Sequence, residues 1–181
     1  MKPLLRFEGV TLRRGGRLLF EGLDLKLGPG EALHVTGPNG SGKTSLIRLA
    51  AGLLRAESGR VERTELALSD EALALDRELP LGRALRFWRA EAGIEAMGLF
   101  ALADVPVRLL SSGQAKRATL ARVASSGTKL WLLDEPLNGL DAEGSERLEA
   151  LIASHRASGG AVLAASHAAL AGDWAQLELG H

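Results

Sequence analysis

The sequence contains no cysteine and no tyrosine, and aromatic residues make up only 4% of its 181 positions. Without cysteine there is no disulfide framework and no thiolate metal site. An excess of one charge is also missing, because 22 Lys and Arg residues balance 22 Asp and Glu residues. The chain therefore lacks the basic surplus that favours nucleic acid or an anionic membrane surface, and we expect no nucleic-acid partner.

Long apolar runs are missing as well. The longest charge-free run, Ala157–Gly172, has 16 residues, which is fewer than the roughly 20 that cross a bilayer. The first residues, MKPLLRFEGV, lack the apolar core of a signal peptide. We expect no transmembrane segment in the chain itself, so a membrane role would have to come through a partner.

Hydrophobic periodicity predicts an α/β fold. Residues 5–12 and 18–27 suggest an antiparallel pair of strands, and residues 64–107, rich in Ala, Leu, Arg and Glu, suggest a mostly helical stretch. Further strands are predicted at 32–36, near 61, at 130–133 and at 161–165, and helices at 43–51, 112–124 and 148–158. Strands that alternate with helices through short connections indicate a mostly parallel sheet.

The segment GPNGSGKT matches the phosphate-loop pattern G-x-x-x-x-G-K-[ST] after an apolar strand and before a helix. Glycines let backbone amides turn toward phosphates, and the helix start adds its dipole. We expect Lys43 to meet the β- and γ-phosphates and Thr44 to bind Mg²⁺. The alternative is a structural glycine turn. The predicted nucleotide-binding residues here are Gly37, Pro38, Asn39, Gly40, Ser41, Gly42, Lys43, Thr44 and Ser45.

Polar residues follow two predicted buried strands. LWLLDEP ends in Asp134 and Glu135, and AVLAAS is followed by His167. At the carboxyl edge of a parallel sheet, Asp134 is placed to hold Mg²⁺ and Glu135 to polarise the attacking water. Taken alone, an Asp-Glu pair is usually a solvated turn and a lone histidine a loop or core residue. The other histidines, His34, His155 and His181, are interpreted as structural or surface residues.

A second polar, glycine-containing helix start reads LSSGQ, with Ser111 and Gly113 suited to an anion. A plain serine N-cap is the alternative. The following helix would be about 20 Å long, longer than the return strand to Asp134. We therefore expect LSSGQ to lie away from its own chain's phosphate site, with its ligand supplied by a second subunit.

The order of GPNGSGKT, LSSGQ, LLDEP, NGLD and His167 resembles the ATP-binding subunit of an ABC transporter. The resemblance implies a P-loop NTPase core with N-terminal antiparallel strands and a small helical lobe. It implies a single ABC ATPase domain over residues 1–181, with a reduced helical subdomain at about 64–124. It also implies ATP and Mg²⁺ as ligands, ATP hydrolysis, a head-to-tail dimer with a second copy, and an integral membrane permease. The chain would then be cytoplasmic and peripheral on the inner face of the cell membrane.

The resemblance also assigns roles to residues. Glu135 would be the general base and His167 the γ-phosphate sensor, while Asp141 of NGLD would couple the two sites of the dimer. The signature residues would contact the partner's ATP; they are Ser111, Ser112, Gly113 and Gln114.

Several positions depart from the family pattern. Ser112 replaces the usual glycine, and Arg14 stands where an aromatic residue normally stacks on adenine, so Arg14 or Phe20 would serve instead. The family's glutamine loop is missing, and Asp70 or Glu71 lies near its place. One branch of the family is similar to this chain in its short length, in NGLD and in residues 105–123. This branch is the ATP-binding subunit of the haem exporter of cytochrome c biogenesis.

Other functions stay open. The chain could serve another transporter, or be a soluble ABC member, although it lacks the long coiled coil of repair members and the two halves of translation members. A regulatory module that binds ATP with little hydrolysis belongs to a different class. A P-loop kinase would leave LSSGQ and His167 without a role.

The carboxylates of Asp70 and Glu71 provide a first test. If one replaces the missing glutamine, alanine at both positions should lower ATP hydrolysis and its coupling to the membrane partner. Phosphate release, measured with and without that partner, gives both the hydrolysis rate and its coupling. If both stayed at the wild-type level, the hypothesis would be wrong.

Overall fold

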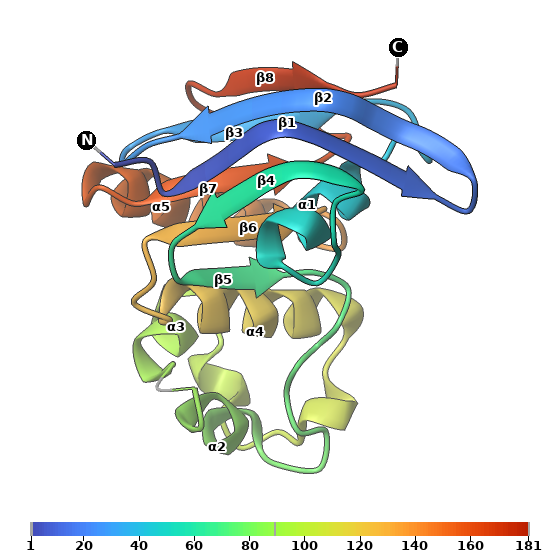
Figure 1. The fold of residues 1–181 in the computed structure, drawn as a ribbon. Coiled ribbons are helices and arrows are strands. Elements are labelled where there is room, and N and C mark those ends of the chain that lie inside the picture. Colours follow the sequence, from blue (N-terminus) through green and yellow to red (C-terminus); the bar gives the residue numbers. More distant parts are fainter. Residues whose placement is uncertain (1, 89, 181) are drawn as a thin grey trace. The chain divides into compact units, whose positions relative to one another are not determined.

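The computed structural model describes residues 2–88 and 90–180 of the chain. Strands β1 (Leu5–Arg14), β2 (Arg17–Leu27) and β4 (Ser58–Arg63) form an antiparallel sheet in the order β2-β1-β4 (Figure 1). Leu5 and Phe7 alternate with exposed Arg6 along β1, the pattern of a sheet with one covered face. The predicted antiparallel pair of strands is therefore confirmed.

A second sheet holds the strand ends that matter for function. Its strands are β3 (Ala32–Thr36), β5 (Leu66–Ser69), β6 (Leu130–Asp134), β7 (Ala161–Ala165) and β8 (Ala175–Glu178). Their order is β5-β6-β7-β3-β8, and β6–β7, β3–β7 and β3–β8 pair in parallel. Every residue of β6 and β7 is buried, as expected for strands covered on both faces. The carboxyl ends of β3, β6 and β7 consequently meet along one edge.

Helix α1 (Lys43–Ala51) follows β3 directly after the phosphate loop. Gly42 precedes it with φ 108°, and Gly52 ends it in the left-handed conformation that glycine adopts without steric cost. Leu46 and Ile47 are fully buried and belong to the same hydrophobic core as the strands around them. This packing fixes the helix start, and with it the loop.

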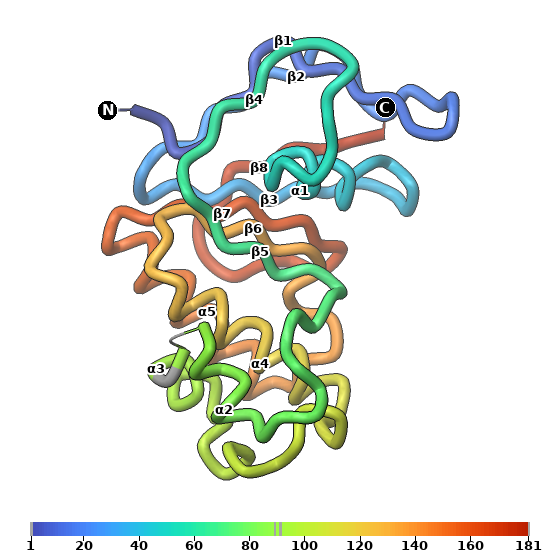
Figure 2. Tube along the Cα trace, turned by 60° about the horizontal axis from the view of Figure 1, so that its bottom comes forward, coloured from blue at the N-terminus to red at the C-terminus, as the bar shows by residue number. Residues whose placement is uncertain are grey.

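The chain divides into two compact units. The first unit comprises Met1–Leu68, Thr128–Glu135 and His155–His181, and the second comprises Ser69–Gly127 and Pro136–Ser154. Helices α2 (Leu81–Arg86), α3 (Glu91–Ala96) and α4 (Ser112–Ala124) lie in the second unit, with 3₁₀ turns at Phe100–Leu102 and Val107–Leu109. A loop without helix or strand, residues 70–79, joins β5 to α2 (Figure 2). Helix α5 (Ala142–Ala157) begins in the second unit, and its last residues count with the first.

The structure differs from the sequence-based expectation in three places. Residues 64–107 contain strand β5 and two helices of only six residues, since prolines and glycines interrupt the stretch. Helix α5 begins at Ala142 rather than at 148, because the Asp141 carboxylate accepts a hydrogen bond from the Gly144 N–H and caps the helix. Strand β8 was not predicted.

Two smaller findings complete the fold. Within residues 2–88 and 90–180, no helix has the length and apolarity to cross a membrane.

His155 stacks on Trp131 with ring centroids 3.8 Å apart and planes 9° from parallel. A packing role fits this stack, and burial lowers the pKa of His155. His181 lies outside the described residues.

Candidate functional site

The phosphate loop places its glycines where backbone geometry requires them. Gly37 has φ 136°, and a Cβ there would lie 2.3 Å from the carbonyl oxygen of Leu179. Gly40 and Gly42 also have positive φ. Side chains are disfavoured at such positions, so the glycines of the motif are explained by the path of the loop. Pro38 and Asn39 are exposed along it, and Ser45 is buried in α1.

Polar groups converge inside this loop. Lys43 is 7% exposed, and its Nζ donates to the carbonyl oxygens of Gly37 (2.8 Å) and Pro38 (3.2 Å). The Ser41 hydroxyl is buried and has no hydrogen-bond partner within the described part of the chain. An ammonium group and an unused hydroxyl inside a ring of glycines fit a phosphate group, because they supply positive charge and a hydrogen-bond donor.

Thr44 and Asp134 form a hydroxyl–carboxylate pair next to the loop. The Thr44 hydroxyl donates to Asp134 Oδ1 at 3.2 Å, and Asp134 is 5% exposed. Hard oxygen ligands of this kind suit Mg²⁺, which usually keeps several waters and phosphate oxygens in its shell. Among residues 2–88 and 90–180, no cluster of three or more His, Cys, Asp or Glu residues is arranged to hold a metal ion by itself. An Mg²⁺ ion at this pair would therefore depend on ligand oxygens from phosphate and water.

Glu135 occupies a strained position beside His167. Its φ is 45°, uncommon for a residue with a side chain, while its N–H donates to the Ala165 carbonyl at 2.8 Å. Glu135 Oε1 lies 3.6 Å from His167 Nε2, and Oε2 accepts from the His167 backbone N–H at 3.4 Å. The first unit thus brings together the phosphate loop, Asp134, Glu135 and His167.

The signature begins α4 in the second unit with a capping box. Ser111 Oγ accepts from the Gln114 N–H at 3.2 Å, and Gln114 Oε1 accepts from the Ser111 N–H at 2.9 Å. The N-cap interpretation is therefore confirmed. It leaves room for anion binding, because the Ser111 hydroxyl uses only an acceptor site and can still donate its proton. Ser112 is exposed at the same end.

The NGLD loop packs against this helix start. A Cβ at Gly113 would lie 2.6 Å from the Gly139 carbonyl oxygen. Asp141 forms a short hydrogen-bonded ion pair with Arg117, which lowers the pKa of that carboxylate, and the Gly144 N–H adds to the effect. A cavity of about 480 Å³ opens between helix and loop, lined in part by Ser111, Gln114, Arg117 and Asp141.

Sequence reasoning missed Arg117. Its side chain is only 12% exposed, and it carries the charge that holds Asp141. The available signal was weak: a basic residue one helical turn after Gly113, on the face that returns to the helix start. Because the partner carboxylate lies 24 positions away, spacing alone did not connect the two.

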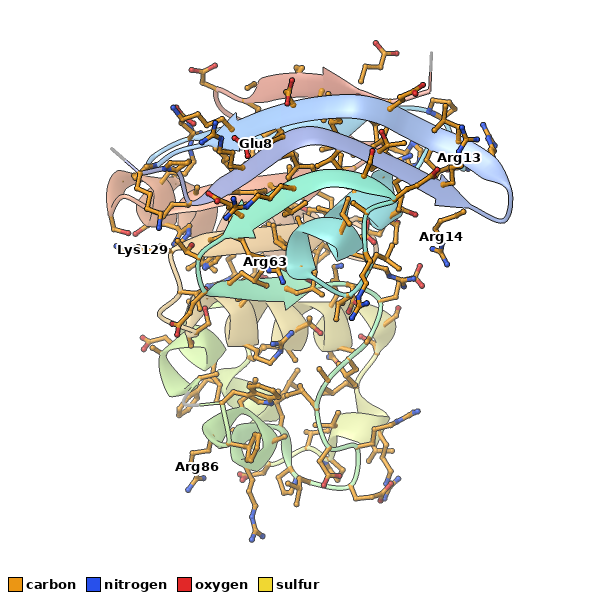
Figure 3. All side chains as sticks on the ribbon, in the orientation of Figure 1. Glu8, Arg13, Arg14, Arg63, Arg86 and Lys129 are labelled. Carbon is orange, nitrogen blue, oxygen red and sulfur yellow. The ribbon has the colours of Figure 1, made fainter. Side chains whose placement is uncertain are left out.

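The two candidates for adenine stacking differ in exposure. Phe20 is 9% exposed within the hydrophobic core, so little of its ring is accessible to a base. Arg14 is exposed at the end of β1, beside the turn into β2 (Figure 3), and it stays the candidate. Asp70, in the second unit, accepts from the Ala72 N–H at 3.0 Å, and its possible role in place of the missing glutamine stays a prediction.

Residues 20–138 match the ABC transporter family, and the chain belongs to this family. Membership implies nucleotide binding. The chain is 56% identical to the cytochrome c biogenesis ATP-binding export protein CcmA of Sphingopyxis alaskensis, over 94% of this chain and 93% of that protein. It is 58% identical to the protein of the same name from Novosphingobium aromaticivorans, over 90% and 87%.

A solved structure, described as the ATP binding subunit of an ABC transporter, has a TM-score of 0.86 to this chain. It is 20% identical, and the match covers 97% of this chain and 85% of that one. At this identity the similarity concerns the fold alone, and it confirms the expected α/β fold with an antiparallel N-terminal sheet and a mostly parallel second sheet.

The tight approach of α4 to the NGLD loop generates a prediction for the signature. Gly113→Ala should displace the Gly139 carbonyl, costing roughly 1–3 kcal/mol of stability and lowering ATP hydrolysis about tenfold or more. Gly28→Ala, where a Cβ would meet only the Glu31 side chain at 3.4 Å or more, is the matched control and should keep hydrolysis within about twofold. Thermal unfolding and phosphate release measure both effects. Equal activity in the two variants would contradict this account of the contact.

Proposed function

We propose that the chain binds ATP with Mg²⁺ and hydrolyses the ATP as the ATP-binding subunit of the exporter that serves cytochrome c biogenesis. One observation carries the chemical part of this proposal. Within the first unit, the phosphate loop, the Thr44–Asp134 pair and the Glu135–His167 pair all follow the carboxyl ends of parallel strands. Ligands of open α/β sheets bind at this edge.

In the proposed mechanism, Lys43 and the loop amides bind and orient the phosphates. Thr44 and Asp134 would hold Mg²⁺, which when bound neutralises negative charge on the phosphate oxygens. Glu135 would accept a proton from the water that attacks the γ-phosphate. The contacts of His167 with both carboxylate oxygens of Glu135 would keep that base oriented, and His167 would also sense the γ-phosphate.

The signature would act on a second copy of the chain. In this arrangement two chains form a head-to-tail dimer, and residues 111–114 of one contact the ATP held by the other. A two-fold dimer makes both sites equivalent. Asp141, held by Arg117 beside the signature, would couple the sites, and Arg14 would stack on adenine. Residues 1–181 would function as one ABC ATPase domain, with a reduced helical subdomain at about 64–124.

The cellular assignment rests on the relatives and goes beyond the chain's own chemistry. Two proteins more than half identical to this chain are named for ATP-binding and export in cytochrome c biogenesis. We infer an integral membrane permease as partner, haem export as the process, and a peripheral position on the inner face of the cell membrane.

Two rivals are tested by different measurements. An ATP-binding regulatory module with little hydrolysis is favoured by the missing loop glutamine and by Ser112. Low steady-state phosphate release from the purified chain would support this module. An ABC ATPase of another transporter would hydrolyse ATP with a different membrane partner.

Glu135→Gln tests the catalytic assignment. The amide cannot accept the proton, so hydrolysis should fall about 100-fold or more, while ATP affinity stays within a few fold. The stalled chain should accumulate as an ATP-bound dimer in size-exclusion chromatography. Glu146→Gln, an exposed change outside the site, is the control. Turnover of the Glu135 variant at the wild-type rate would remove Glu135 from the mechanism.

Co-purification tests the exporter assignment. A tagged chain, recovered from gently solubilised membranes of its native host, should bring a haem-exporter permease and cytochrome c maturation proteins, identified by mass spectrometry. A different permease would move the process elsewhere and leave the ATPase mechanism intact. Absence of any membrane protein would contradict the transporter role.

A further inference from the structure

We infer that His34 is a positioning residue for Glu135 and His167, acting through one peptide bond. The inference rests on the proposed function, in which these two residues act on the γ-phosphate. His34 lies in β3, three residues before Gly37, and is 4% exposed. Its neighbours Leu33 and Val35 are apolar core residues. A buried imidazole in this setting is costly unless it makes hydrogen bonds.

The bond that His34 makes is specific. Its Nε2 lies 3.0 Å from the carbonyl oxygen of Ser166, the residue before His167. Because a carbonyl oxygen only accepts, Nε2 must carry the hydrogen. The Ser166 N–H donates to the Val35 carbonyl at 3.3 Å, and Ser166 is 1% exposed. Strand β3 therefore holds both backbone groups of Ser166. The Val35 carbonyl binds its N–H, and the His34 side chain binds its carbonyl oxygen.

The peptide unit that links Ser166 to His167 also contacts the candidate base. Its carbonyl, on Ser166, accepts from His34, and its N–H, on His167, donates to Glu135 Oε2 at 3.4 Å. Since a peptide is planar, fixing the carbonyl also fixes the direction of the N–H. A hydrogen bond at the carbonyl further polarises that N–H. His34 thus orients, from the strand before the phosphate loop, the donor that faces Glu135.

Trp174 secures the far end of the same segment. Its indole meets the His34 ring edge-on, with centroids 6.2 Å apart and an angle of 69° between planes. Trp174 is 8% exposed, and its Nε1 donates to the Ala171 carbonyl at 2.8 Å. The His167 side chain, half exposed, therefore lies in a short segment that His34 holds at Ser166 and that Trp174, in contact with the His34 ring, holds at Ala171.

Two variants separate the hydrogen bond from packing. His34→Leu removes the donor, whereas His34→Gln keeps an N–H group that can reach the Ser166 carbonyl. In the ligand-free full chain, amide hydrogen exchange at His167 and Ala168 should be about tenfold faster in the leucine variant and close to wild type in the glutamine variant. Unchanged exchange in His34→Leu, or equally fast exchange in both variants, would overturn the inference.

Turnover gives the functional reading. We expect kcat to fall about tenfold in His34→Leu with KM for ATP within about twofold, and rescue by His34→Gln. The double variant with Glu135→Gln should lose little more activity than Glu135→Gln alone, because the N–H that His34 orients acts on that carboxylate. A larger, additive loss would contradict the positioning role.

Failure of the proposed function can be distinguished from failure of the inference about His34. If the wild-type chain did not hydrolyse ATP, the exchange experiment would still decide whether His34 holds the segment. If the leucine variant did not fold, nitrogen NMR of the wild-type chain would decide instead. We expect His34 as the Nε2–H tautomer with a slowly exchanging ring proton, and the Nδ1–H tautomer would refute the hydrogen bond.

Discussion

Parallel pairing of β6, β7 and β3 is the constraint on which the candidate site depends. Parallel neighbours run in one direction, so the segments after Thr36, Asp134 and Ala165 leave the sheet at the same edge. The ladder also continues beyond the strands. Glu135 donates to Ala165, and Ser166 donates to Val35. The chemistry of the first unit is therefore arranged by an extension of the sheet's own hydrogen bonds, so side-chain packing need not fix it alone.

The second unit reaches precision by different means. Its helices α2 and α3 have only six residues each, and α4 starts with a capping box of reciprocal hydrogen bonds between Ser111 and Gln114. A loop carbonyl lies so close to Gly113 that only glycine fits, and Arg117, whose side chain is 12% exposed, fixes Asp141. Caps, one close backbone contact and one ion pair thus take the place of the sheet, each depending on a few residues.

Local signals explain what could be predicted from the sequence. Gly42 and Gly52 mark both ends of α1, continuous apolar runs mark β6 and β7, and Ser111 marks the start of α4. Strand β8 has four mostly exposed residues and takes its place by pairing with β3, which no local pattern encodes. The six-residue helices α2 and α3 are too short to show a period. The contact between His34 and Ser166 spans 132 positions, so only the folded sheet brings them together.

The left-handed backbone of Glu135 sets stability against activity at that residue. A side chain at φ 45° carries a steric cost on the order of 1 kcal/mol that glycine would not pay. A glycine there would relax the turn and would also remove the carboxylate that faces His167. A stabilising change to glycine would thus remove the proposed general base, so only selection on the proposed function would retain the strained glutamate.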